Sequence, residues 1–173
     1  MQMSAPIQVY DSLEYRLLKA KKEVWISGND CKFVAETQSG FIDTILNKGI
    51  SVKICCVDYR SEAVEMLTKI DPRFPNAASF INSMQSVEIV LKDFQKRYPD
   101  NFEFSYLPIL PSLGMFFVDP YESNGFIKFE LYTAKPWLPI TSRPHFILNN
   151  RVSMWRSYFI QQWINYWALS NVQ

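Results

Sequence analysis

Residues 51–59, with the sequence SVKICCVDY, constrain the fold of this chain more than any other segment. They are almost entirely apolar, whereas a strand with one face in water alternates apolar and polar side chains. Runs of this kind are typical of parallel sheets, in which both faces of a strand are covered. A strand at 23–29 and a helix at 36–48 precede the run. The order strand, helix, strand therefore predicts a right-handed parallel unit.

The rest of the chain adds further helices and a set of closely spaced strands. The predicted helices are 10–22, 36–48, one that starts at residue 62, 77–98 and 151–169; the predicted strands are 23–29, 51–59, 102–107, 113–119, 125–132 and 143–148. Lys135–Ser142, with two prolines, is expected to be an exposed loop. Because no repeat or linker interrupts the chain, we expect one α/β domain, residues 1–173, with a mixed β-sheet flanked by helices.

The charge and hydropathy of the sequence argue against several classes of function. Eighteen basic and 17 acidic residues leave a formal net charge of +1, so no overall field draws the protein to nucleic acid or to an anionic membrane. The apolar stretches are shorter than the roughly 18–20 residues that a membrane span needs. The N-terminus lacks the layout of a signal peptide. Three cysteines without metal-ligand spacing are most simply explained by a reduced, cytoplasmic protein.

Few side chains in the sequence are suited to catalysis. His145 is the single histidine. It is either a hydrogen-bonded structural residue or, with Arg143 on the same strand face, part of a small anion-binding pair. Cys55 and Cys56 lie in the apolar strand, where thiols behave as small buried hydrophobes, and Cys31 lies in a loop that is expected to be more exposed. The sequence shows neither clustered metal ligands nor a glycine-rich phosphate loop, so we expect no metal and no cofactor.

The C-terminal helix is rich in aromatic residues, and they exceed what one packed face needs. One helical stripe is expected to lie in the core, namely Val152, Trp155, Phe159, Trp163 and Tyr166. Tyr158 and Trp167 extend the apolar surface beyond this stripe. Large aromatic side chains left over on a helix often mark an interface. Both homodimerisation and ordinary burial stay open for these two residues.

Residues 112–119, SLGMFFVD, hold Ser112, Gly114 and Asp119 at the first, third and eighth positions. Together with EVWISGN (23–29) and SVKICCVDYRSEAV (51–64), in which Asp58 ends a strand before a helix, this window resembles phospholipase D-like domains. The catalytic motif of that family, HxKxxxxD, falls on the window, with Ser112, Gly114 and Asp119 at its three fixed positions in turn. The later segments NGFIKFELY and RPHFIL are similar to small bacterial members that lack the catalytic residues.

The resemblance implies a cleft without phosphodiesterase chemistry. Active members use the histidine as a nucleophile on phosphorus and the lysine to hold phosphate oxygens. Ser112 would need a general base, and Gly114 supplies no cation. The cleft would then bind a ligand, with an anionic small molecule or nucleotide as the class to test first. The predicted ligand-binding residues are Asp119, Lys128, Glu130, Arg143 and His145.

Lys128 and Glu130 alternate with apolar residues, so both side chains share one face of the predicted strand 125–132. Either this face is buried and the two charges are paired, because unpaired burial would be costly, or the face meets solvent.

Three functional hypotheses stay open. The one we favour is a non-catalytic phospholipase D-like module, possibly regulatory, that binds an anionic ligand or a protein partner and self-associates as a homodimer. The second is a phosphodiesterase- or nuclease-like enzyme with altered active-site residues, using His145 with Ser112 or Asp119. The third is a purely structural oligomerisation protein driven by the aromatic helix.

Overall fold

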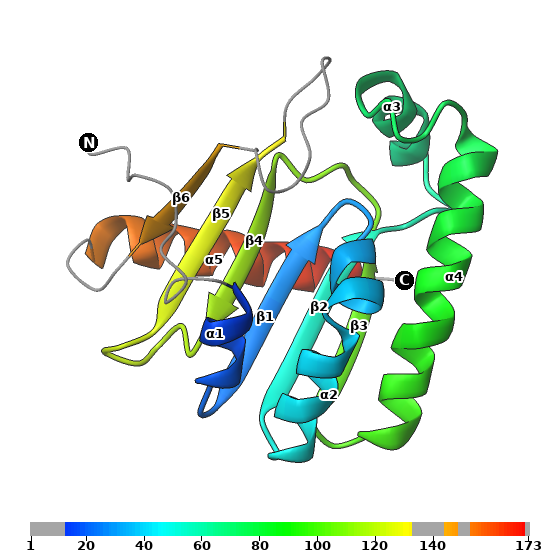
Figure 1. The fold of residues 1–173 in the computed structure, drawn as a ribbon. Coiled ribbons are helices and arrows are strands. Elements are labelled where there is room, and N and C mark those ends of the chain that lie inside the picture. Colours follow the sequence, from blue (N-terminus) through cyan, green and yellow to red (C-terminus); the bar gives the residue numbers. More distant parts are fainter. Residues whose placement is uncertain (1–12, 133–143, 149–152, 172–173) are drawn as a thin grey trace.

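A computed structural model describes residues 13–132, 144–148 and 153–171. They form one six-stranded sheet with the order β3-β2-β1-β4-β5-β6 (Figure 1). Its strands are β1 (Glu23–Gly28), β2 (Ser51–Val57), β3 (Phe102–Leu107), β4 (Leu113–Val118), β5 (Phe126–Leu131) and β6 (His145–Leu148). The pairs β1–β2 and β2–β3 are parallel, whereas β1–β4, β4–β5 and β5–β6 are antiparallel. The predicted mixed α/β sheet and its parallel unit are confirmed.

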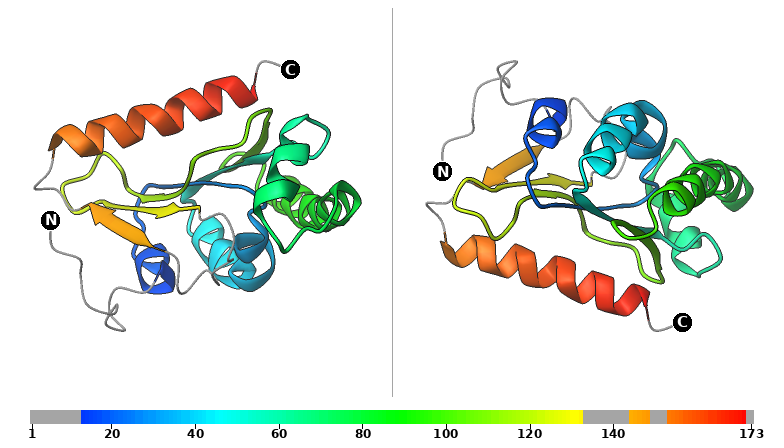
Figure 2. Two further views of the ribbon diagram at one scale, coloured as in Figure 1. Left: turned by 90° about the horizontal axis from the view of Figure 1, so that it is seen from above. Right: turned by 90° about the horizontal axis from the view of Figure 1, so that it is seen from below.

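The helices are divided unequally between the two faces of the sheet. They are α1 (Leu13–Leu18), a π-helical turn (Phe33–Thr37), α2 (Ser39–Asn47), α3 (Ala63–Ile70), α4 (Ala77–Arg97) and α5 (Ser153–Ser170). Figure 2 shows α5 alone on one face, with α1 and α2 on the other. None of the helices within the described ranges is long and apolar enough to cross a membrane.

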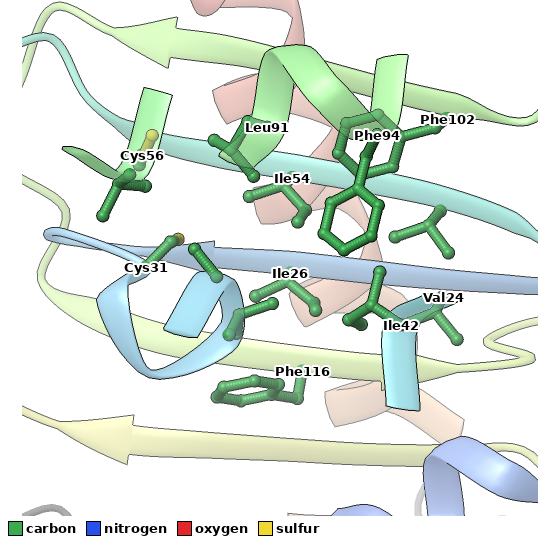
Figure 3. Close-up of a cluster of buried hydrophobic side chains, with 14 of the residues drawn as sticks. Val24, Ile26, Cys31, Ile42, Ile54, Cys56, Leu91, Phe94, Phe102 and Phe116 are labelled. Carbon is green, nitrogen blue, oxygen red and sulfur yellow. The ribbon is translucent and has the colours of Figure 1, made fainter. Parts of the chain in front are cut away.

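The main core lies between the sheet and the helices α2 and α4. Val24 and Ile26 of β1 and Ile54 of β2 point to this side and pack near Ile42 of α2 and Phe94 of α4 (Figure 3). All five side chains are at most 2% exposed. Burying a side chain of this size contributes about 1.5–3 kcal/mol. The apolar run at 51–59 is thus explained, because β2 lies inside the sheet and is covered on both faces.

A smaller core lies under α5. Trp163 stacks on Trp25 of β1, with ring centroids 4.6 Å apart, and Phe159 stacks on Phe129 of β5 at 4.3 Å. These contacts confirm the predicted burial of Phe159 and Trp163. Trp155 was expected in the same stripe but is 50% exposed. Its ring lies against Phe159 of its own helix, one turn away. Val152 lies outside the described residues.

The first described helix is shorter than predicted. The sequence predicts a helix to residue 22, but α1 ends at Leu18. The reason is Asp119, whose carboxylate accepts hydrogen bonds from the backbone N–H groups of Lys21, Lys22 and Glu23 at 2.9, 2.8 and 3.0 Å. These N–H groups are therefore held in a bend that leads into β1. The predicted residues 10–12 and the loop at 135–142 lie outside the described residues.

Candidate functional site

The carboxyl end of β1 is the place where this sheet favours a ligand site. From β1 the chain goes through α2 to β2 on one side, whereas β4 joins β1 on the other side. In open α/β sheets, ligands bind beside the carboxyl ends of strands at such a switch point. Figure 1 shows the carboxyl end of β1 at the top of the sheet. A pocket of about 50 Å³ lies here. Its lining includes Gly28, Asn29, Asp30, Arg73, Gly114, Glu130 and Tyr132.

The strand register brings four of the residues singled out in the sequence to this part of the sheet. Gly114 of β4 is opposite Glu130 of β5, and Glu130 is opposite His145 of β6. Lys128 lies in the next row on the same face, opposite Phe116. The predicted group of Gly114, Lys128, Glu130 and His145 therefore shares one face of three neighbouring strands.

Lys128 and Glu130 form a largely buried ion pair. The Lys128 Nζ lies 2.6 Å from Oε1 of Glu130, and the two side chains are 14% and 4% exposed. The alternative in which this face meets solvent is wrong. Removing one partner of a buried pair typically costs about 3–5 kcal/mol, because the other charge is left unpaired. Lys128 is thus committed to Glu130 in this structure.

Arg73 brings a second cation to the pocket, and sequence reasoning missed it. Its Nη1 lies 2.9 Å from Oδ2 of Asp30, and its Nη2 lies 2.5 Å from Oδ2 of Asp71. Burial opposes the charge of Arg73, but hydrogen bonding to Asp71 and the charge of Asp30 raise the net pKa of its guanidinium. The sequence signal for a polar site here was the pair Asn29-Asp30, which directly follows the strand β1.

The charged groups at the pocket are paired within the protein, with carboxylates outnumbering cations by three to two. The carboxylates of Asp30, Asp71 and Glu130 face the cations of Arg73 and Lys128. Both of these cations are therefore paired in the described part of the site. An incoming anion would have to displace a carboxylate before it could reach either one.

Asp119 does not join this group. It follows β4 at the end away from Gly114, about 17 Å along the strand at ~3.4 Å per residue. Its backbone has a left-handed φ of 49°, and its carboxylate is held by the N–H groups that precede β1. Ser112 is an exposed residue just before β4, near the pocket edge. Arg143 lies outside the described residues.

Tyr132 is a pocket residue that the sequence did not reveal. Its hydroxyl oxygen accepts a hydrogen bond from the backbone N–H of Asn29 at 3.0 Å. A Cβ added to Gly114 would lie 3.0 Å from that oxygen, and one added to Gly28 would lie 3.2 Å away. Burial raises the pKa of Tyr132 well above its ordinary value. The ring therefore occupies space that two glycines leave open.

Among the described residues, no activated nucleophile lines the pocket. Cys31 lines it but is buried, contrary to the expectation of an exposed loop. The hydrogen bond to the Cys56 thiol, together with burial, raises the pKa of Cys31. Burial likewise raises the pKa of Cys55 to about 12. Thiols with such pKa values stay protonated at neutral pH. His145 and Asp119 lie at opposite ends of the sheet, so they cannot act as a pair.

Metal ligands are not gathered in the described part of the chain, where no group of three His, Cys, Asp or Glu side chains could hold an ion. The charged groups of the pocket instead form ion pairs with one another. The arrangement is a small, internally paired polar site rather than an open one, since ligand pockets commonly enclose about 300–1,000 Å³.

No family model and no curated protein matches this sequence. Two solved structures resemble its fold. A phosphatidylserine synthase from Haemophilus influenzae Rd KW20 has 16% identity and a TM-score of 0.58, over 88% of this chain and 34% of the synthase. TrmBL2, an archaeal chromatin protein with a novel mode of DNA binding, has 16% identity and a TM-score of 0.52, over 90% of this chain and 46% of TrmBL2.

The likeness to the synthase shows a fold that is shared over most of this chain. At 16% identity the likeness concerns the fold alone and does not extend to the HxKxxxxD positions. This chain spans less than half the length of either protein.

Proposed function

We propose that this protein is a non-catalytic, phospholipase D-like interaction module that self-associates through the outer face of α5. The observation that carries the proposal is the exposure of large apolar side chains on this helix. Met154 is 71% exposed, Trp155 50% and Tyr158 51%. Exposed apolar side chains that gather on one helix are a common mark of an interface.

The outer face of α5 also lacks charge. The helix contains a single charged residue, Arg156. Its guanidinium donates hydrogen bonds to the backbone carbonyls of Pro120, Glu122 and Gly125, at 2.6–3.3 Å. Because Arg156 is occupied within the protein, the exposed face offers nothing to a charged partner. A second copy of the same uncharged face is the partner that this surface suits, since two-fold contacts pair a patch with itself.

The sheet under α5 has room for a second helix. α5 runs across the strands, with Phe159 on β5 and Ser170 at β3, so the free space lies beside the helix, along the strands. A six-residue strand such as β4 is about 20 Å long at ~3.4 Å per residue, whereas one helix is only about 10 Å wide. Leu113 and Leu131, which pair across β4 and β5, lie on this face, and Leu131 is 37% exposed. An α5 helix from a second copy, packed beside the first, would cover both leucines and the exposed aromatic rings of α5.

Light scattering of the purified protein and a charged variant tests this proposal. Wild type is expected to have twice the mass of the chain, and the double variant Trp155→Glu, Tyr158→Glu is expected to be a folded monomer. A matched control places glutamates at Met66 and Ile89, which are 53% and 72% exposed on α3 and α4. The control should remain a dimer. A monomeric wild type, or a dimeric α5 variant, would contradict the proposal.

The anionic ligand predicted from the sequence is a separate part of the proposal. Such a ligand would compete with Glu130 for Lys128, so we expect weak binding that is lost in Lys128→Ala and in Arg143→Ala. Isothermal titration with phosphate and with a nucleotide measures it. The prediction of an anionic ligand would be contradicted if wild type bound none of the anions tested. It would also be contradicted if both variants bound them as well as wild type does.

A further inference from the structure

Two glycines face each other where β1 meets β4. The register of these strands runs to Ser27 opposite Met115, so the next residues in line are Gly28 and Gly114. Both lack the side chain that would otherwise extend from the sheet into the pocket. The missing side chains leave a recess at the switch point of the sheet.

The phenol ring of Tyr132 fills this recess. Cβ atoms added to Gly28 and to Gly114 would lie 3.2 and 3.0 Å from its hydroxyl oxygen, and the latter would also lie 3.4 Å from Cζ. These distances are close to or below van der Waals contact. A side chain at either glycine and the ring in its present position therefore exclude each other.

The recess also recognises the hydroxyl group. The backbone N–H of Asn29 donates a hydrogen bond to the Tyr132 oxygen at 3.0 Å. Asn29 directly precedes Asp30, the residue that pairs with Arg73. A neutral phenol can accept this hydrogen bond, whereas a plain hydrocarbon ring would leave the N–H group without its acceptor. The site thus combines the shape of an aromatic ring with a hydrogen-bond donor placed for its hydroxyl oxygen.

We propose that the recess between Gly28 and Gly114 is a phenol-binding socket, and that the protein fills it with its own Tyr132. The ligand class is a neutral phenol, which differs from the anion predicted for the cleft. With Tyr132 in place, the remaining pocket of about 50 Å³ holds no more than a few water molecules. Removing the side chain would leave a cavity shaped like the missing ring, and cavities of this kind bind small aromatic molecules.

The direct test is Tyr132→Ala titrated with p-cresol, which has the shape of a tyrosine side chain. We expect p-cresol to bind the variant, to raise its melting temperature, and to bind roughly tenfold more tightly than toluene because its oxygen accepts the hydrogen bond from the Asn29 N–H. Wild type and Tyr132→Phe, whose rings fill the socket, are expected to show no binding. A folded Tyr132→Ala that ignores p-cresol, or a wild type that binds it equally well, would overturn the proposal.

A second measurement serves if Tyr132→Ala does not fold. Nitration by tetranitromethane, mapped by mass spectrometry, should spare Tyr132 in wild type and modify Tyr121, which is 63% exposed and lies outside α5. Gly114→Val should displace the ring and make Tyr132 reactive. Gly40→Val is the matched control, because a Cβ at Gly40 meets no atom within 4 Å.

Protection of Tyr132 that persists in Gly114→Val, or reactivity that is already high in wild type, would contradict the socket. Neither nitration nor p-cresol binding depends on the outer face of α5. Failure of the socket is therefore distinguishable from failure of the proposed self-association.

Discussion

Asp119 links the end of β4 to the start of β1. Its two carboxylate oxygens accept hydrogen bonds from the N–H groups of Lys21, Lys22 and Glu23, and the residue is 3% exposed. Hydrogen bonds to a charged acceptor contribute about 1.5–3 kcal/mol each. The left-handed φ of 49° is one that aspartate and asparagine tolerate better than most residues. Asp119 is therefore a structural residue, which fits its distance from the pocket.

Replacement of Asp119 by alanine should lower the free energy of unfolding by about 3 kcal/mol or more, because three partly buried N–H groups lose their charged acceptor. Asp119→Asn should cost less, about 2 kcal/mol, since one amide oxygen can still accept. Urea denaturation measures both. Glu122→Gln is the control, as the pair of Lys22 with Glu122 is exposed and should change stability by under about 1 kcal/mol. Equal effects at 119 and 122 would refute this role.

The buried thiols predict a loss of stability at alkaline pH. Burial raises the pKa of Cys55 from 9.0 to about 12. An unfolded chain releases this proton near pH 9, whereas the folded protein keeps it, so the contribution of Cys55 is complete below pH 9 and is lost as the pH rises toward 12. The free energy of unfolding should fall by about 1.4 kcal/mol per pH unit per thiol in this range.

Denaturant titrations between pH 7 and pH 10.5 check this slope, and Cys55→Ala provides the comparison. The variant should lose less stability than wild type as the pH rises. Because Cys31 and Tyr132 also have raised pKa values, part of the slope should remain. Identical slopes in the two proteins would show that Cys55 is not the group that titrates.

At the scale of elements, the turn between β4 and β5 anchors α5 to the sheet. Arg156 of α5 donates to three backbone carbonyls of this turn. Gly125 makes the arrangement possible, since a Cβ there would overlap both the carbonyl oxygen of Asp119 and the guanidinium of Arg156. One glycine thus lets the turn, the helix and the end of β4 meet.

Gly125→Ala should therefore destabilise the protein by about 2 kcal/mol or more, in the range of overpacked cores. Thermal unfolding followed by circular dichroism measures the change. Gly40→Ala is the matched control in α2, where a Cβ meets nothing and alanine should add up to about 1 kcal/mol of helix stability. A Gly125→Ala variant as stable as wild type would contradict the overlap expected between a Cβ at this position and the carbonyl oxygen of Asp119.

Elements that depend on local patterns could be predicted from the sequence, and those that depend on distant contacts could not. The apolar run 51–59 predicts a strand that is covered on both faces, and β2 is such a strand. The end of α1 depends instead on Asp119, about a hundred residues further on. Tyr132 reads as the last residue of a strand, and its place in the pocket follows only from the glycines on β1 and β4.

The candidate site shows the same division. Alternation along β5 predicts that Lys128 and Glu130 share a face, but not that they pair and are buried. Arg73 comes from the connection between α3 and α4, and no spacing in the sequence relates it to Asp30. A window such as 112–119 marks a strand whose two ends are about 17 Å apart in space, at ~3.4 Å per residue. Asp119 and Gly114 for this reason serve different parts of the molecule.

At the scale of the whole molecule, the two faces of the sheet differ in cover, with α5 alone on one of them (Figure 2). Self-association that covers this face links folding to protein concentration. The melting temperature of wild type should rise by a few degrees over a hundredfold increase in concentration, by scanning calorimetry. Trp155→Glu with Tyr158→Glu should abolish the dependence. A wild-type melting temperature independent of concentration would argue against a dimer that is coupled to folding.

The pairing of β1 with β4 also bears on how the chain is made. β1 leaves the ribosome well before its partner on one side, β4, which comes some 90 residues later, as Val24 pairs with Val118. At about 5–20 residues per second, one edge of β1 stays open for roughly five to twenty seconds. During that time its apolar strand is a template for other nascent chains. Among the described strands, β1 therefore has the edge that waits longest for its partner while the protein is being synthesised.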